Sequence, residues 1–284
     1  MLIEFSVKNY RSFRDEAILS LEATKSSTLK SVVIPFRGTP ILPSAPIYAK
    51  NGGGKSNVIR AFWLAVQFIR NAQRTQHEKA PIPVTPFALN DYSASEPTKF
   101  SFLYTLDGIR YWYSFSATKE KVYTELLYHA PKGRKTLVFA REGQEFSFTE
   151  AKARRKLISQ VVAENQLFFS VACTMNDVDC GKAMMWFREM IYFSRDYSDI
   201  PRQLLEYPND ANILRAISNY AKAADVGIED MRFEINGKQI DEEAAFSEEI
   251  RAELVQFMRL LSETSNDSET NLKAISIHQG KDKI

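Results

Sequence analysis

The clearest chemistry in the chain lies in a glycine-rich segment near residue 50. Its residues follow the P-loop pattern G-x-x-x-x-G-K-[ST], in which backbone N–H groups cradle phosphates, the lysine reaches the β- and γ-phosphates, and the hydroxyl ligates Mg²⁺. Gly54, Lys55 and Ser56 fill the last three positions, so Ser56 is the candidate Mg²⁺ ligand. The candidate ATP-binding residues of this segment are Ala49, Lys50, Asn51, Gly52, Gly53, Gly54, Lys55, Ser56 and Asn57.

The first position of the pattern is Ala49 instead of glycine. Glycine at this point lets the chain turn without a Cβ beside the phosphates. An alanine is therefore strained if the position needs a positive φ. We expect nucleotide affinity to depend on how the loop accommodates this residue.

The flanking sequence predicts a strand, a glycine-rich turn and a helix. Pro46–Tyr48 is a short apolar run, and apolar residues then recur at helical spacing up to about Gln73. A helix N-terminus favours an anion, because its unpaired N–H groups and its dipole act together. The alternative is a glycine-rich surface turn before an ordinary helix. The apolar helix positions are Val58, Ile59, Phe62, Ala65, Val66 and Ile69.

Length and composition set broad limits on the class of protein. A chain of 284 residues forms one large domain or two small ones. The net charge of +2 neither favours nor excludes a nucleic-acid partner. Two cysteines are too few for a disulfide framework, and neither they nor the histidines have metal-ligand spacing. With no membrane-spanning apolar run and no signal peptide, we expect a cytoplasmic protein without membrane contact.

The first half of the chain predicts a sheet of antiparallel strands. Ile3, Phe5 and Val7 alternate with polar residues, and further strands are expected at Ala17–Ala23 and Val32–Phe36. Asp107-Gly108 is a two-residue hairpin turn between strands of matching parity. The aromatic residues here are predicted to form the sheet core, with base stacking as the alternative. Further strands of this meander are expected at Val122–His129, Thr136–Arg141 and Glu145–Phe148.

The second half is predicted to be mainly helical. We expect a helix at Ala151–Glu164 and a buried strand at Gln166–Cys173. A small hairpin is expected at Met231–Ile240, around Asn236-Gly237, and a strand at Leu272–His278. The remaining predicted helices are Lys182–Met190, Pro201–Glu206, Asp210–Ala224 and Glu243–Ser262.

The order of these elements resembles an ABC-type ATPase head. It is most similar to the SMC-like and RecF/OLD-like ATPases, in particular to bacterial AAA-family ATP-binding proteins that are often encoded in phage-defence loci. The resemblance covers nearly the whole chain. Its motifs are Asn9–Phe13, Asn51–Asn57, Phe87–Asn90, Glu96-Pro97, the Asp107-Gly108 hairpin with Tyr111 and Tyr113, Leu167–Ser170 and Ala224–Ile228.

The resemblance implies further nucleotide contacts. In such heads the turn after the first strand contributes to the pocket, which makes Arg11 and Ser12 candidates for contact with the ATP phosphates or ribose. Arginine suits phosphate because its planar fork binds two oxygens at once. The alternative for Arg11 is an ordinary surface turn residue. The glutamine that reaches Mg²⁺ in these heads has no clear counterpart, since alignment on the apolar run Leu167–Cys173 places Thr174 at its position and leaves Gln166 before that run.

Motifs for ATP hydrolysis are missing from the sequence. Hydrolysis in this class needs a Walker B strand, an apolar run that ends in Asp-Glu, and a serine-rich signature. Phe168–Asp177 and Ile191–Asp196 are interrupted by polar residues, and Ser262–Ser265 has no following glycine. We expect either the first lobe of a longer or split ATPase, or a degenerate one. Alone it would bind nucleotide but hydrolyse it poorly.

The expected fold is α/β: a P-loop NTPase of the ABC-ATPase-head type, with an antiparallel meander and a mostly helical segment. The expected divisions are a P-loop core at 1–75, a β subdomain at 84–150, a helical subdomain at 151–264, and a strand at 271–284 that returns to the core and is apparently truncated.

Two functions remain open on the sequence. One is an ATP-dependent switch whose partner is a second head in a homodimer or a C-terminal half; the other is an inactive P-loop-derived assembly module. Nucleic acid is a candidate partner through two basic clusters, although a solvated surface explains them as well. A GTPase is disfavoured because Asn-Lys-x-Asp is absent, and a small-molecule kinase because of the large meander. The basic clusters are Lys132, Arg134 and Lys135, and Lys152, Arg154, Arg155 and Lys156.

Overall fold

The computed structural model describes residues 1–24, 32–72, 80–89, 91–191, 219, 222–223, 228–235, 238–239 and 272–278. The chain divides into two units, Met1–Tyr192 and Phe193–Ile284. Each unit is described by itself. Among the described residues, no helix combines the length and the apolar character that crossing a membrane requires.

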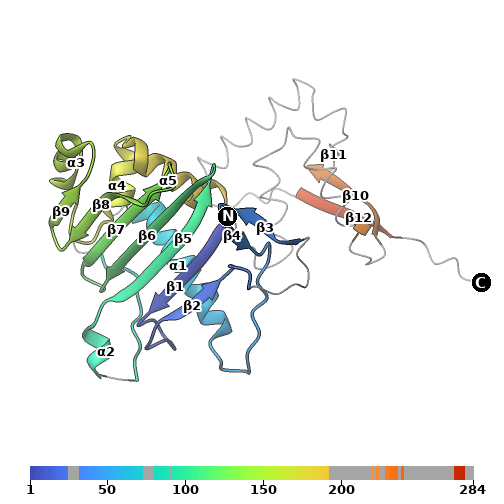
Figure 1. Cartoon of the computed structure of the whole chain (residues 1–284). Coiled ribbons are helices and arrows are strands. Elements are labelled where there is room, and N and C mark those ends of the chain that lie inside the picture. Colours follow the sequence, from blue (N-terminus) through green and yellow to red (C-terminus); the bar gives the residue numbers. More distant parts are fainter. Residues whose placement is uncertain are drawn as a thin grey trace, which may run out of the picture. The chain divides into compact units, whose positions relative to one another are not determined.

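A seven-stranded antiparallel sheet forms the centre of the first unit (Figure 1). Its strand order is β2-β1-β5-β6-β7-β8-β9, so the N-terminal strand pairs directly with the meander. The expected segments 1–75 and 84–150 therefore share one sheet. The strands are β1 (Leu2–Lys8), β2 (Ala17–Ser20), β5 (Thr98–Leu106), β6 (Ile109–Ala117), β7 (Val122–Ala130), β8 (Thr136–Glu142) and β9 (Glu145–Phe148).

The predicted hairpin between β5 and β6 is confirmed. Leu106 pairs with Ile109, and Asp107 and Gly108 both have positive φ, at 50° and 72°. A two-residue turn with this geometry matches the right-handed twist of the strands that it joins. Together with β7, β8 and β9 this pair forms the predicted antiparallel meander.

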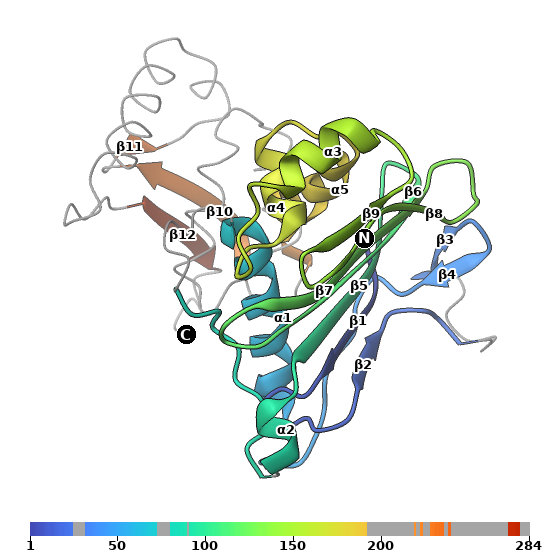
Figure 2. The ribbon, with the colours of Figure 1, turned by 90° about the vertical axis from the view of Figure 1, so that its left-hand side faces the viewer.

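Helices cover one face of the sheet (Figure 2). The aromatic side chains on that face form the core, as predicted: Tyr104 stacks on Trp186 with ring centroids 4.3 Å apart and donates a hydrogen bond to the Ala183 carbonyl. Such aromatic pairs add to the gain from burial. The helices are α1 (Lys55–Asn71), the short α2 (Asp91–Ser95), α3 (Lys152–Ser159), α4 (Phe168–Thr174) and α5 (Val178–Glu189).

The predicted strand at Gln166–Cys173 is wrong, because this segment forms helix α4. Phe168 to Ala172 are all buried, so the apolar pattern shows no helical period. The helix is specified from a distance: the N–H groups of Phe168 and Phe169 each donate to the buried carboxylate of Glu125 on β7, at 2.8 Å. The helix expected at Ala151–Glu164 is also shorter and ends at Ser159.

The predicted strand before the P-loop is wrong as well. Residues 42–50 contain no strand, and Tyr48 is 88% exposed. A strand is stabilised by the hydrogen bonds of a neighbour, and Pro46 lacks an N–H to donate. The preceding region forms a small hairpin of β3 (Ile34–Phe36) and β4 (Thr39–Ile41), where only one strand was expected.

The second unit contains a three-stranded sheet with the order β11-β10-β12. The predicted hairpin is confirmed by the pairing of Glu234 with Gln239, and β12 pairs with β10 instead of a strand of the large sheet. Residues 219, 222 and 223 are helical, in agreement with the helix expected at Asp210–Ala224. The helices expected at 201–206 and 243–262 lie outside the described residues. The strands are β10 (Ile228–Ile235), β11 (Lys238–Gln239) and β12 (Leu272–His278).

Candidate nucleotide-binding site

The P-loop leads directly into helix α1. Gly54 precedes the helix in the left-handed conformation, with φ +85°, and offers no side chain to cap it. The first helical turn contains no acidic residue. Because the first N–H groups of a helix have no partner within it, this helix start suits an external anion.

Two glycines of the loop have no room for a side chain. A Cβ on Gly53 would lie 2.9 Å from both the Ala49 Cβ and the Lys50 carbonyl oxygen. A Cβ on Gly54 would lie 3.1 Å from the Phe13 ring and 3.3 Å from the Ser12 hydroxyl, in addition to the strain of its positive φ. The glycines are therefore required by local packing as well as by the motif.

Ser12 lies against the P-loop, while its predicted contact with ATP stays a prediction. The Asn57 side-chain amide donates a hydrogen bond to the Ser12 hydroxyl over 2.9 Å. Arg11 belongs to the same turn, but it bonds away from the loop: its backbone N–H donates to the Thr85 carbonyl and its Nε to the Tyr10 hydroxyl. The structure thus brings Ser12 to the loop, and assigns Arg11 contacts within its own turn and to Thr85.

Asn9 fixes this turn and was not among the predicted site residues. It is buried and has φ +53°. Its side chain donates to the carbonyls of Ser93 and Glu96 and accepts from the Phe87 N–H. Asparagine tolerates the left-handed region and bonds to nearby backbone, so its place directly after a strand was the available signal.

Lys55 is folded back over its own loop. Its ammonium group donates hydrogen bonds to the carbonyls of Ala49 and Lys50. The Gly53 N–H also donates to the Lys50 carbonyl, over 3.0 Å. To reach a phosphate, the lysine exchanges these carbonyl oxygens for phosphate oxygens.

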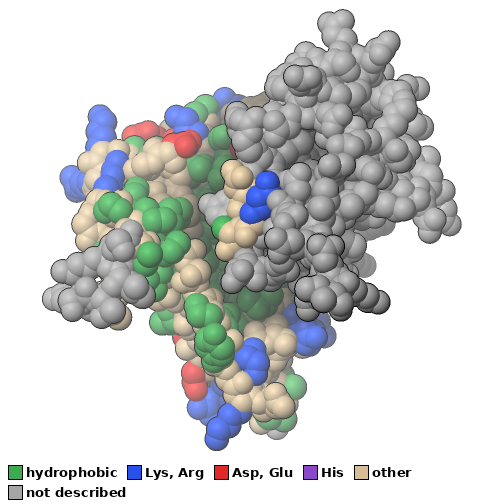
Figure 3. All heavy atoms as spheres, turned by 90° about the vertical axis from the view of Figure 1, so that its right-hand side faces the viewer, with side chains coloured by type: hydrophobic (Ala, Val, Ile, Leu, Met, Phe, Trp, Pro, Cys, Tyr) green, Lys and Arg blue, Asp and Glu red, His purple; other side chains and the backbone are tan. Residues whose placement is uncertain are grey.

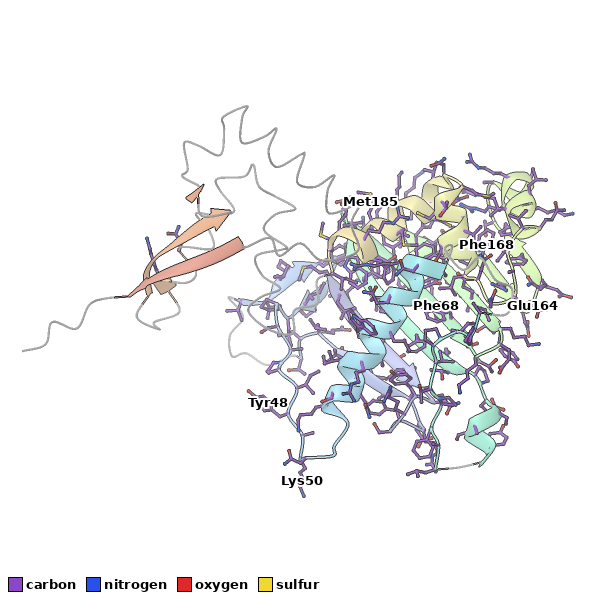
Figure 4. The ribbon with its side chains drawn as sticks, turned by 180° about the vertical axis from the view of Figure 1, so that it is seen from behind. Tyr48, Lys50, Phe68, Glu164, Phe168 and Met185 are labelled. Carbon is purple, nitrogen blue, oxygen red and sulfur yellow. The ribbon has the colours of Figure 1, made fainter. Side chains whose placement is uncertain are left out.

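Strain at Ala49 was predicted only if this position needs a positive φ, and Ala49 has no positive φ in the structure. The loop from residue 49 to residue 53 is exposed, with Lys50 at its tip and Tyr48 on the segment that leads into it (Figure 4). Ser56 is exposed beside the loop. The glycine geometry, the uncapped helix start and the free access of solvent fit a nucleotide with Mg²⁺, which Ser56 would ligate.

The acidic residue of one candidate Walker B segment has a structural task. Asp177 accepts two hydrogen bonds from Arg155, at 2.8 and 3.0 Å, and one from the Cys180 N–H at the start of α5. Burial raises the pKa of Asp177, but these hydrogen bonds outweigh it and hold the pKa below its usual range. The other candidate segment lies outside the described residues beyond Ile191. Within the described part of the chain, no group of three or more His, Cys, Asp or Glu side chains is arranged to hold a metal.

Thr174 and Gln166 were compared with the Mg²⁺-reaching glutamine of the family, and both form hydrogen bonds to nearby backbone groups. The Thr174 hydroxyl donates to the Ser170 carbonyl inside α4, and the Gln166 side chain accepts from the Ala163 N–H. Gln166 lies in the loop before α4 and Thr174 is the last residue of α4, although a strand was predicted at Gln166–Cys173. The alignment of this segment with the family therefore rested on the wrong secondary structure.

Two arginines of the second basic cluster are used in contacts within the first unit. Arg155 is only 1% exposed, so it is a buried structural residue and not part of a phosphate-facing surface. Arg154 donates to the carbonyls of Met175 and Asn176. On the face shown in Figure 3, Lys and Arg side chains lie at several separate places, with apolar side chains between them. A nucleic-acid partner therefore stays a prediction.

Comparison with known proteins gives one family. The sequence model of an AAA domain, described as "putative AbiEii toxin, Type IV TA system", matches residues 50–210, which is more than half of the chain. A search of curated proteins found no match. The match begins at the P-loop and continues through the meander and helices α3, α4 and α5. The chain therefore belongs to this AAA-domain family and is a nucleotide-binding α/β P-loop ATPase.

Proposed function

We propose that this chain is the ATP-binding lobe of an ABC/SMC-like ATPase, in which binding of Mg-ATP acts as a switch. The observation that carries the proposal is the start of α1. There a left-handed Gly54 ends the loop against Ser12 and Phe13, and the first helical turn has no acidic residue. This combination leaves backbone donors available to an anion.

Each residue of the loop has a role in this proposal. The N–H groups of Asn51–Gly54 cradle the phosphates, for which that of Gly53 gives up its bond to the Lys50 carbonyl. Lys55 binds the β- and γ-phosphates, and Ser56 is a ligand of Mg²⁺. Bound Mg²⁺ would neutralise phosphate charge. Arg11 and Ser12 approach the nucleotide from the turn that follows β1, where Arg11 supplies a positive charge.

The contacts around the loop provide a route for the switch. When Lys55 leaves the carbonyls of Ala49 and Lys50, the loop loses two of its own hydrogen bonds. The loop contacts Ser12 and Phe13, and their turn is tied through Asn9 to Phe87, Ser93 and Glu96. Nucleotide binding thus acts on the β1 turn and on the segment before β5.

Binding of Mg-ATP tests the proposal directly. Isothermal titration calorimetry on the native chain, Lys55→Ala and Lys50→Ala separates the motif lysine from a neighbouring lysine in a variable position of the same loop. We expect Lys55→Ala to weaken binding at least about tenfold, which corresponds to the loss of one charge-assisted contact. Lys50 takes part through its backbone, which alanine keeps, so Lys50→Ala should bind like the native chain. Equal affinity of the native chain and Lys55→Ala would sink the assignment.

The exposed loop is also where we place a partner. A second head that closes over the nucleotide would form a homodimer, so Mg-ATP should increase the dimer fraction in sedimentation velocity experiments. The DNA-repair or phage-defence setting is part of the proposal; it rests on the resemblance to SMC-like heads and on the toxin–antitoxin description of the matched family. A C-terminal half would be the partner instead if the dimer fraction did not respond to Mg-ATP although ATP was bound.

A second function, an assembly module without nucleotide, is favoured by the position of Lys55. Its ammonium group is already bound by two carbonyls of the loop. A ligand that binds only the folded state must raise the unfolding temperature. No thermal shift at millimolar Mg-ATP, together with a stable complex with a partner, would favour this function over the first.

A further inference from the structure

A cavity of about 540 Å³ opens in the first unit between the β7–β8 turn and helix α5. This volume is in the range of small-molecule sites. Its lining residues come from β6, β7, the β7–β8 turn, β8, the loop before α3, and α5. They are Ile109, Tyr111, His129, Pro131, Lys132, Arg134, Thr136, Glu150, Asp179 and Lys182.

The cavity and the P-loop lie at opposite ends of the sheet. The turn that contacts the P-loop follows Lys8 at the end of β1. Lys8 pairs with Lys99 on β5, and Lys99 pairs with Ser116 on β6. Tyr111 on β6, which lines the cavity, pairs with Tyr104 on β5, and Tyr104 pairs with Leu2 at the other end of β1. Along β6 these two rows, at Ser116 and Tyr111, are five residues of extended strand apart, which is about 17 Å. The cavity is thus too far away to be part of the P-loop site.

Positive charge is in excess around the cavity. Lys132 and Arg134 lie on the turn and Lys182 lies on α5, so the cations come from two walls. None of the three forms a salt bridge with another residue in the described part of the chain. Of the two lining carboxylates, Asp179 is held by Arg155 over 2.6 Å.

Neutral hydrogen-bond donors add to these cations. Burial and nearby acidic groups raise the pKa of Tyr111 to about 12, so its hydroxyl keeps its proton. The Thr136 side chain is a second hydroxyl in the lining. Burial lowers the pKa of His129, which therefore contributes no charge at neutral pH.

We propose that this cavity binds a terminal phosphate group, that is, a phosphomonoester. A terminal phosphate carries nearly two negative charges and three acceptor oxygens, which match cations placed on two walls. An internal phosphodiester carries only one negative charge, so it matches cations placed on two walls less well than a terminal phosphate does. The ester is either a free nucleotide or the 5′ end of a nucleic acid.

Equilibrium binding with matched probes tests this proposal. The probes are adenosine monophosphate against adenosine, and a short oligonucleotide with a 5′-phosphate against the same oligonucleotide with a 5′-hydroxyl. All variants of the full chain carry Lys55→Ala, so that the P-loop contributes less. The test variant adds Arg134→Gln and Lys182→Gln. The control adds Lys99→Gln and Lys119→Gln, which remove the same charge from exposed positions on β5 and on the turn between β6 and β7.

We expect the phosphorylated probe of at least one pair to bind about tenfold or more tightly than its partner, as a charge-assisted contact provides. The test variant should lose this preference and the control should keep it. Preference within the nucleotide pair identifies a free nucleotide as ligand, and preference within the oligonucleotide pair alone identifies a nucleic-acid end. Equal binding within both pairs, or a test variant that keeps the preference, would overturn the proposal. Because residues 49–57 are the same in all variants, the result is independent of the test of the P-loop.

Discussion

The side-chain amide of Asn57 donates a hydrogen bond to the hydroxyl of Ser12 over 2.9 Å. It connects the first turn of α1 with the turn after β1, although the two residues are 45 positions apart in the sequence. Phe13, next to Ser12, lies against Gly54. The conformation of the P-loop is therefore held partly by the N-terminal strand.

Replacing Ser12 with alanine should weaken ATP binding. The change removes the acceptor of Asn57 at the edge of the loop, and an exposed hydrogen bond of this kind contributes about 1 kcal/mol. We expect Mg-ATP affinity to fall about fivefold in calorimetry, with little change in unfolding temperature. Ser147→Ala, at an exposed position on β9, is the control. Native affinity in Ser12→Ala would show that the contact does not position the loop.

Gly54→Ala should cost more stability than Gly133→Ala, although both glycines have φ +85°. A Cβ at Gly133 meets no atom within 4 Å, so that variant measures only the strain of the left-handed backbone, about 1–2 kcal/mol. A Cβ at Gly54 additionally crowds the Phe13 ring at 3.1 Å. We expect a further loss of about 1 kcal/mol in the free energy of unfolding by urea.

Nucleotide binding separates these two variants further. Gly54→Ala should lose most of its affinity for Mg-ATP, because the loop has to shift away from Phe13 to admit the methyl group. Gly133→Ala should bind like the native chain. If both variants lost the same stability and kept full affinity, the close contact of Gly54 with the β1 turn would have no role in the site.

The antiparallel sheet was predictable because its signals are local. Alternation along Phe100, Phe102 and Tyr104 fixes which face is buried, and the Asp107-Gly108 turn fixes the register of β5 with β6. The P-loop was equally visible, since its glycines, Lys55 and Ser56 are contiguous. Local patterns of this kind need no knowledge of the tertiary structure.

The errors arose where distant residues decide the local structure. Nothing in the pattern of Leu167–Cys173 indicates that Glu125, more than 40 positions earlier, accepts its first N–H groups and favours a helix. Pro46–Tyr48 has the composition of a strand, but a strand forms only where a neighbour supplies hydrogen bonds. Ser12 was a candidate nucleotide contact only through the family resemblance, and its hydrogen bond to Asn57 was not predicted, because no periodicity connects residues 12 and 57.

Acid should destabilise the native chain more than Asp177→Asn. Although burial opposes it, hydrogen bonding to Arg155 lowers the pKa of Asp177 below its ordinary value near 3.8. A lowered folded-state pKa means that this carboxylate contributes its full stabilisation above about pH 4, and that the contribution is lost as the pH falls through the folded-state pKa. The free energy of unfolding should therefore drop in this acidic range.

Urea unfolding between about pH 3 and pH 7 measures this dependence. The difference in unfolding free energy between the native chain and Asp177→Asn isolates the one carboxylate, because the other acidic groups are common to both. We expect the difference to be largest near neutral pH, at about 3 kcal/mol for a broken buried ion pair, and to shrink below pH 4. A difference that does not change with pH would mean that Asp177 does not titrate against Arg155.

Glu125→Gln should be among the most destabilising single changes in the first unit. The Glu125 carboxylate is fully buried; it accepts hydrogen bonds from Phe168, Phe169 and Tyr113 and lies 3.7 Å from the Arg141 guanidinium. Glutamine has the same size, but its NH₂ group would face at least one of these donors in either orientation, and Arg141 would lose its buried counter-charge. Breaking a buried pair in this way costs about 3–5 kcal/mol.

Urea unfolding followed by circular dichroism measures the loss, and Glu142→Gln, exposed on the neighbouring strand β8, is the control. A loss below about 1 kcal/mol would mean that α4 holds its place on the sheet through apolar packing alone.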